Sequence, residues 1–177
     1  YSNQMSRSHD YGNGFNWIVS QWGYLNESGD GTITVVRGPG RNLWFELNGV
    51  GGYVGRFGAV STLTHDKAEG LLVLTTPVGE QFAYHDFDQF EHPPGVMAWH
   101  KDAGGQLTEV TAYTDDDHIV AIQRSVEQDG QTITEALAYD YFGSGEQRGR
   151  LRHVTLRRKV DAGDWTDIQR AKYDYYG

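Results

Sequence analysis

The chain has no cysteine among its 177 residues and only four prolines. The absence of cysteine excludes disulfide bonds, thiolate metal sites and cysteine nucleophiles, although it leaves the cellular compartment open. No apolar run approaches the roughly 18 residues that a membrane-spanning helix requires, so we predict no membrane span. The formal net charge is −9. Because phosphate binding needs a concentrated positive surface, we also predict no nucleic-acid partner.

Short runs of alternating apolar and polar residues fill most of the chain. Residues 32–36, 43–47 and 118–122 are examples, and this period of two is typical of half-buried β-strands. Turn dipeptides such as Asp30-Gly31 and Asp129-Gly130 separate the runs and accept positive φ in tight hairpins. We therefore predict an all-β fold, built as an antiparallel meander of β-hairpins.

A change in composition occurs at residues 91–95, where Pro93 and Pro94 forbid a continuous strand ladder. The boundary divides a glycine- and tryptophan-rich region, residues 1–92, from a region of more regular strands, residues 93–177. Neither part alone has enough apolar runs for a separate closed core, which favours two subregions of one continuous sheet.

Two short motifs recur in the second half of the chain. A Tyr-Asp-Tyr phrase occurs at residues 139–141 and again at 173–175, and a Gly-x-Leu-x-x-Val element occurs at 105–110 and at 149–154. Such self-similarity is typical of repeat architectures, in which each unit buries its apolar face against a neighbour. We predict structural roles for the motif residues, which are Tyr139, Asp140, Gly149, Arg150, Leu151, Val154, Tyr173, Asp174, Gly105, Leu107 and Val110.

The segment from Tyr139-Asp140 through Gly149-Arg150-Leu151 to Val154 resembles the Tyr-Asp (YD) repeat of the RHS-repeat family. Residues 11–45, marked by glycine and tryptophan, are similar to the region that commonly precedes those repeats. The resemblance implies an extended, curved sheet that forms part of a β-shell. It implies a non-catalytic role in a bacterial shell or in a secreted or cell-surface scaffold, by encapsulation of a toxic C-terminal cargo or by surface interaction. The implied partners are the rest of the same polypeptide, that cargo, and further copies that associate through open sheet edges.

The chain departs from the family pattern at two points. Residues 141–148 separate the Tyr-Asp pair from Gly-Arg-Leu, which predicts a surface excursion there. The Asp-Pro signature of the family's self-cleavage region does not occur in this sequence, so no autoproteolysis is assigned to it. Since the chain starts at Tyr1 without an initiator methionine and ends just after a motif, we expect a fragment with an open sheet edge near residues 165–176.

The densest polar cluster is at residues 85–92, with His100 nearby. His85 and His92 could join a carboxylate around a metal ion, but their spacing fits neither a helical pair nor the usual zinc patterns. A solvated strand end is the favoured interpretation, and we predict no metal and no cofactor. Residues 8–10 are Ser, His and Asp, the three residue types of a hydrolase triad, yet consecutive residues cannot adopt the geometry of that triad. We predict that the chain is not an enzyme.

A carbohydrate-binding β-module is the main alternative, and a hydrolase with unlocated catalytic groups comes third. The module hypothesis depends on the five tryptophans, Trp17, Trp22, Trp44, Trp99 and Trp165, as sugar-stacking platforms. Aromatic residues on alternating strands more often pack across strands, so we predict that at least three are mostly buried. We predict that Tyr139 and Tyr173 are both buried in equivalent places. Residues 148–159 hold six of the 15 basic residues, which indicates the exposed edge or the outer face of a strand, or a contact with an acidic partner.

Overall fold

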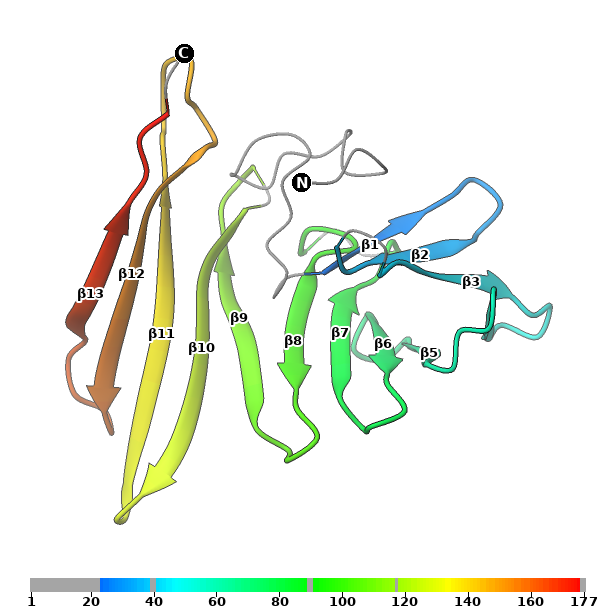
Figure 1. The fold of residues 1–177 in the computed structure, drawn as a ribbon, viewed down its shortest axis with the longest axis horizontal. Coiled ribbons are helices and arrows are strands. Elements are labelled where there is room, and N and C mark those ends of the chain that lie inside the picture. The colour runs from blue at the N-terminus through cyan, green and yellow to red at the C-terminus, as the bar shows by residue number, and fades with distance from the viewer. Residues whose placement is uncertain (1–22, 39–40, 89–90, 117, 176–177) are drawn as a thin grey trace. The chain divides into compact units, whose positions relative to one another are not determined.

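The computed structural model describes residues 23–38, 41–88, 91–116 and 118–175. The regular structure of these residues is thirteen strands in two antiparallel sheets, which confirms the prediction of an all-β, hairpin-built fold (Figure 1). Within the described part of the chain, no helix is long and apolar enough to cross a membrane.

The smaller sheet has the order β1-β2-β3-β4, and the larger sheet contains β5 to β13 in chain order. Among β5 to β8, and again among β9 to β13, each strand pairs with the next one in the sequence, as in a meander. The bounds are β1 (Tyr24–Glu27), β2 (Ile33–Val36), β3 (Leu43–Leu47), β4 (Tyr53–Gly55), β5 (Thr62–Asp66), β6 (Leu71–Thr75), β7 (Gln81–His85), β8 (Met97–Lys101), β9 (Leu107–Tyr113), β10 (Ile119–Gln128), β11 (Gln131–Tyr141), β12 (Leu151–Val160) and β13 (Thr166–Lys172).

The described residues fall into two compact units that divide after Gln106. Strands β1 to β8 belong to the first unit and strands β9 to β13 to the second. Pro93 and Pro94 lie in the connection between β7 and β8, inside the first unit. The division into a region before the repeats, residues 1–92, and a repeat region, residues 93–177, stays a prediction. The prediction that both belong to one continuous sheet is wrong, because the described strands form two sheets.

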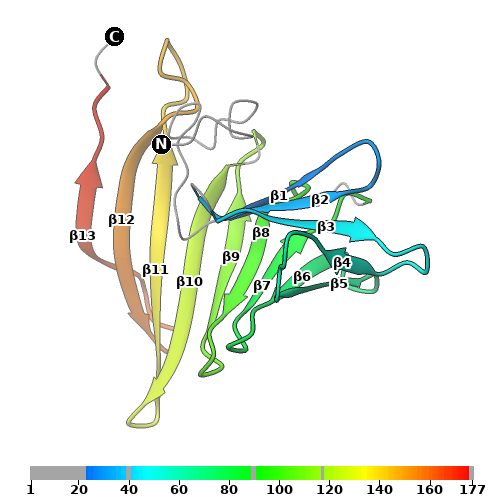
Figure 2. The same cartoon turned by 45° about the vertical axis from the view of Figure 1, so that its right-hand side comes forward.

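The first unit has the better-developed core. In Figure 2 the strands of the smaller sheet run across the direction of β7 and β8. All four residues of β2 are buried, in contrast to the alternating burial of β6. The backbone amide of Leu25 donates a hydrogen bond to the carbonyl of Gly95 at 2.7 Å, which ties β1 to the segment before β8. Full burial of an aliphatic side chain stabilises a fold by about 1.5–3 kcal/mol. The largest fully buried side chains are Tyr84, Phe45, Ile33, Leu72, Leu74, Val35 and Thr34.

The second unit contains a long hairpin, which β10 and β11 form around Asp129-Gly130. Both turn residues have positive φ, 53° and 77°, and Gln128 pairs with Gln131 on either side of them. Two positive φ values are the requirement of the tight hairpin turn that an Asp-Gly dipeptide predicts. The sequence expectation at this turn is confirmed.

Candidate functional site

The two Tyr-Asp phrases lie at corresponding ends of β11 and β13. Both strands pair with β12 in antiparallel fashion, so they run in the same direction on its two sides. Tyr139 lies near the end of β11, and Tyr173 directly follows β13, where its amide still donates to the carbonyl of Arg152 at 2.9 Å. The repeated phrases therefore lie at the same end of the three-stranded ribbon that β11, β12 and β13 form.

The burial of the two tyrosines differs. Tyr139 is 8% exposed, whereas Tyr173 is 41% exposed. The prediction of burial is confirmed for Tyr139 and wrong for Tyr173. The reason is that β11 lies between β10 and β12, while β13 has β12 as its only neighbour among the described strands. The prediction of equivalent places is also wrong, because Tyr139 lies within β11 opposite Val154, whereas Tyr173 follows the end of β13 and bonds to Arg152.

The phenol groups of Tyr139 and Tyr141 are protonated at neutral pH. Burial raises the pKa of Tyr139 and Tyr141, and smaller contributions come from neighbouring phenols, including those of Tyr173 and Tyr175. The Tyr141 hydroxyl donates to the carbonyl of Ile119 at 2.6 Å. A large rigid ring with a satisfied hydroxyl is suited to holding neighbouring strands in register.

The excursion between the two motifs is closed at its base by backbone hydrogen bonds. Phe142 N donates to Arg150 O at 2.9 Å, and Gly149 N donates to Phe142 O at 2.8 Å. Residues 143–146 are exposed, as the surface excursion predicts. Gly149 has a φ of +79°, and a Cβ at this position would lie 3.3 Å from His118 Cε1. Both its conformation and its surroundings therefore favour glycine.

The two Gly-x-Leu-x-x-Val elements each begin a strand. Gly105 and Gly149 have positive φ, 89° and 79°, and the leucine two positions later is the first residue of β9 and of β12, respectively. The leucines differ in environment, because Leu151 is buried and Leu107 is exposed. The glycine opens the turn in both elements, and the packing of the leucine depends on the neighbouring strands.

The aspartates of the Tyr-Asp phrases form ion pairs. The Asp140 carboxylate lies 2.9 Å from His153 Nδ1 and 3.9 Å from a guanidinium nitrogen of Arg152. Asp174 lies 2.9 Å from Lys172 Nζ. Exposed pairs of this kind contribute about 0–1 kcal/mol each, so their role is to orient the strand ends.

An open recess of about 310 Å³ lies on the ribbon of β11, β12 and β13. Arg170 Nε donates to Thr155 Oγ1 at 3.0 Å within it, and an Arg170 guanidinium nitrogen lies 3.3 Å from Asp167. Acidic and basic groups are mixed in this recess, so its charge favours no ligand of one sign. The lining residues are Ala138, Tyr139, Asp140, His153, Thr155, Arg157, Asp167 and Arg170.

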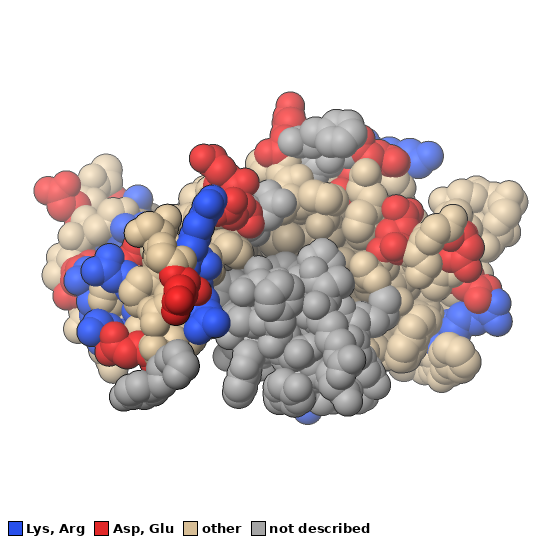
Figure 3. All heavy atoms as spheres, turned by 90° about the horizontal axis from the view of Figure 1, so that it is seen from above, with Lys and Arg blue, Asp and Glu red and all other residues tan. Residues whose placement is uncertain are grey.

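The basic stretch at residues 148–159 does not form a uniform positive surface. Arg148 pairs with Asp116, and Arg158 pairs with Glu135. In Figure 3, basic and acidic side chains alternate over the part of the molecule that holds β11 to β13, on the left of the view. Because β12 pairs with both β11 and β13, the prediction of an exposed strand edge is wrong, and the paired charges favour the outer face of a strand over a docking site for an acidic partner.

The described tryptophans are Trp44, Trp99 and Trp165, and all three are half-buried. Trp44 meets Phe57 edge to face with ring centroids 5.7 Å apart, and the Arg157 guanidinium lies over Trp165 at 4.5 Å. These contacts are packing contacts between side chains, as the alternation of apolar and polar residues along the strands indicates. Trp17 and Trp22, and the triplet at residues 8–10, lie outside the described residues.

The structure does not assemble the metal site first considered from His85 and His92. The two rings stack at 4.3 Å, and burial lowers the pKa of His85 to about 4. The neighbouring Asp86 instead contacts His65, which lies on β5. The sequence offered no local signal for His65, because its proximity depends on the pairing of β5, β6 and β7.

Comparisons of the chain with protein-family models, with curated proteins and with solved structures find no match.

Proposed function

We propose that this chain is a structural, non-catalytic segment of a YD-repeat shell or of a secreted or cell-surface scaffold of that kind. The observation that carries the proposal is that both Tyr-Asp phrases lie at the same end of the ribbon of β11, β12 and β13. One phrase is on β11 and the other directly follows β13. Two copies of one phrase at the same end of neighbouring strands support a repeat, because repeated units place the same sequence at similar points along successive strands.

The outer edge of β13 supports the same function. All seven residues of this strand are exposed, and within the described part of the chain it pairs only with β12. An unpaired strand edge is a template for a further strand. We infer that the next hairpin of the same polypeptide pairs here and covers Tyr173 as β12 and β10 cover Tyr139. Enclosure of a cargo by such a sheet, or display on a cell surface, is the activity that this architecture suits.

The test is an extension of the chain by the residues that follow Gly177 in its reading frame. We expect further Tyr-Asp and Gly-Arg-Leu units in that extension, and slower amide hydrogen exchange at Thr166–Lys172 in the longer protein than in the present chain. The amides of β6, a strand that already has two neighbours, are the internal control and should not change.

Two outcomes would contradict the proposal. One is a downstream sequence without these units, together with unchanged exchange of β13. The other is specific glycan binding by the present chain on an array, which would favour the carbohydrate-binding module.

A further inference from the structure

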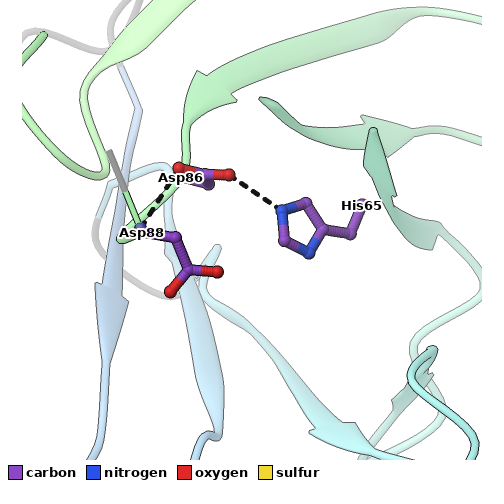
Figure 4. A group of neighbouring side chains, drawn as sticks. All are labelled: His65, Asp86 and Asp88. Carbon is purple, nitrogen blue, oxygen red and sulfur yellow. Dashed lines mark hydrogen bonds and ion pairs between the residues drawn. The ribbon is translucent and has the colours of Figure 1, made fainter. Parts of the chain in front are cut away.

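Three side chains with metal-binding atoms converge in the first unit. His65 projects from β5, and Asp86 and Asp88 follow the end of β7 (Figure 4). His65 Nε2 lies 2.9 Å from Asp86 Oδ2, and one ligand atom from each of the three residues lies within 4.8 Å of the others. The three groups come from segments that are about twenty residues apart, so the fold assembles them.

The register of β5, β6 and β7 fixes this arrangement. Leu72 of β6 pairs with His65 on one side and with Tyr84 on the other. The amide of Asp86 donates to the carbonyl of Gly70 at 2.9 Å, which fastens the end of β7 to the turn before β6. The positions of the imidazole and of the first carboxylate therefore follow from backbone pairing.

A local hydrogen bond holds the second carboxylate nearby. The amide of Asp88 donates to Asp86 Oδ1 at 3.2 Å, so Asp86 uses one oxygen for the backbone and the other for His65. Figure 4 shows the Asp88 side chain beside the contact between Asp86 and His65. Asp88 is exposed, so its carboxylate can rotate without disturbing the core.

The charge of this cluster is not balanced by permanent cations. Asp86 is only 5% exposed, and a buried carboxylate is costly unless a positive group or a metal ion accompanies it. Among the described residues, the ion pair of Asp86 is with His65, whose charge depends on protonation. No lysine or arginine of the described chain forms an ion pair with Asp86 or Asp88.

The pKa of Tyr53 on β4 responds to the same concentration of negative charge. The pKa of its phenol is raised first by partial burial and then by nearby carboxylates. Those carboxylates are Glu27, Asp88 and Asp86. Glu27 thus adds to the negative electrostatic potential near Asp86 and Asp88.

We propose that His65 Nε2 and the carboxylates of Asp86 and Asp88 form a binding site for a divalent transition-metal ion, with Zn²⁺ as the best match. One imidazole nitrogen and two carboxylate oxygens are ligands that Zn²⁺ accepts, at bond lengths of about 2.0–2.2 Å. Two ligand atoms of a tetrahedral Zn²⁺ site lie roughly 3.3 Å apart, so His65 and Asp86 need to separate only slightly. Rotation of Asp88 supplies the third ligand and leaves one position for water.

The alternative is a plain hydrogen bond between histidine and aspartate, and the chain contains a matched example. His153 Nδ1 lies 2.9 Å from Asp140 Oδ2, the same separation as at His65. At that pair, however, Arg152 lies 3.9 Å from the same carboxylate oxygen, and the pair is not part of any three-residue cluster of metal-ligating groups in the described chain. His153 is therefore the control residue for His65.

The experiment is calorimetric titration of ZnCl₂ into the chain after removal of metals with a chelator. We expect one site per chain. The substitutions His65→Ala and Asp88→Asn should each weaken its affinity at least tenfold, and His153→Ala should leave it unchanged. Absence of Zn²⁺ binding, equal weakening by His153→Ala, or tighter binding of Mg²⁺ or Ca²⁺ than of Zn²⁺ would overturn the proposal.

A second measurement covers the case in which His65→Ala does not fold. Asp88 is exposed, so Asp88→Asn should fold, which circular dichroism can verify. Co²⁺ in place of Zn²⁺ should give the visible absorption of a four-coordinate ion with mixed nitrogen and oxygen ligands in the unmodified chain. Asp88→Asn should change that spectrum, and an identical spectrum in the folded variant would exclude the site.

Discussion

Tyr139 and Tyr173 occupy corresponding strand ends on the two sides of β12, yet one is 8% exposed and the other 41%. The local sequence Tyr-Asp-Tyr is the same at both places, but Tyr139 lies within β11 between two strands, whereas Tyr173 follows the end of β13, which has one neighbour among the described strands. This difference predicts that the two positions respond differently to the same substitution.

Replacement of Tyr139 by alanine should lower the free energy of unfolding by about 3–5 kcal/mol, as for other large buried aromatic side chains. Tyr173→Ala is the matched control and should cost less than about 1 kcal/mol in the present chain. Urea denaturation followed by circular dichroism gives both values. Equal losses would show that strand position does not determine the contribution of the motif.

Gly149→Ala should destabilise the second unit by about 1–2 kcal/mol. Alanine is strained at a φ of +79°, and its Cβ would press on the ring of His118. Gly143→Ala in the same excursion is the control, because a Cβ there has nothing within 4 Å and the φ is not in the left-handed range. Thermal or urea unfolding of the two variants compares them directly, and a cost at Gly143 as large as that at Gly149 would argue against this explanation.

The stability of the first unit should fall as the pH drops from 6.5 toward 4. Burial lowers the pKa of His85 from 6.5 to about 4, so the unfolded chain takes up a proton in this range before the folded chain does. The contribution of His85 is thus fully present above pH 6.5 and is lost on acidification, by up to about 3 kcal/mol. The measurement is urea unfolding at pH 7 and at pH 4.5, with His85→Gln as the comparison. A variant with the same pH dependence as the original chain would disprove the assignment to His85.

The outer edge of β13, which no other described strand pairs with, should cause reversible self-association that light scattering detects across a concentration series. Ile168 is an exposed apolar residue on this strand, and a lysine on an edge strand opposes pairing with another copy. Ile168→Lys should therefore shift the chain toward monomers. Leu137→Lys makes the same change at an exposed position of β11, a strand with neighbours on both sides, and should have no effect. Monomers at every concentration of the unmodified chain would refute the prediction.

Much of the fold follows from local sequence. Alternation and turn dipeptides predict the strands, and Asp129-Gly130 adopts the two positive φ values that its hairpin requires. Alternation does not determine which sheet a strand joins. Residues 24–55 contain four such runs, and they form a sheet separate from the one that begins at β5.

The local sequence also does not determine which residues meet at the candidate sites. The repeated phrase identified Tyr139 and Tyr173, but the exposure of Tyr173 depends on the absence of a second neighbour beside β13 among the described strands, which no motif encodes. Asp86 and Asp88 were visible as part of a polar cluster. Their partner His65 was not, because the contact arises only after β6 pairs with both β5 and β7.

The meander order of the larger sheet has a consequence for how the chain folds. Among β5 to β8, and again among β9 to β13, each strand pairs with the next one in the sequence, so most hydrogen-bonded partners are separated by a single short connection. Low contact order favours rapid folding for a β protein, because little loop-closure entropy is lost before each contact forms. Every hairpin can dock on the preceding strand as soon as it leaves the ribosome. A sheet of this kind can be assembled in step with translation, whatever its final length.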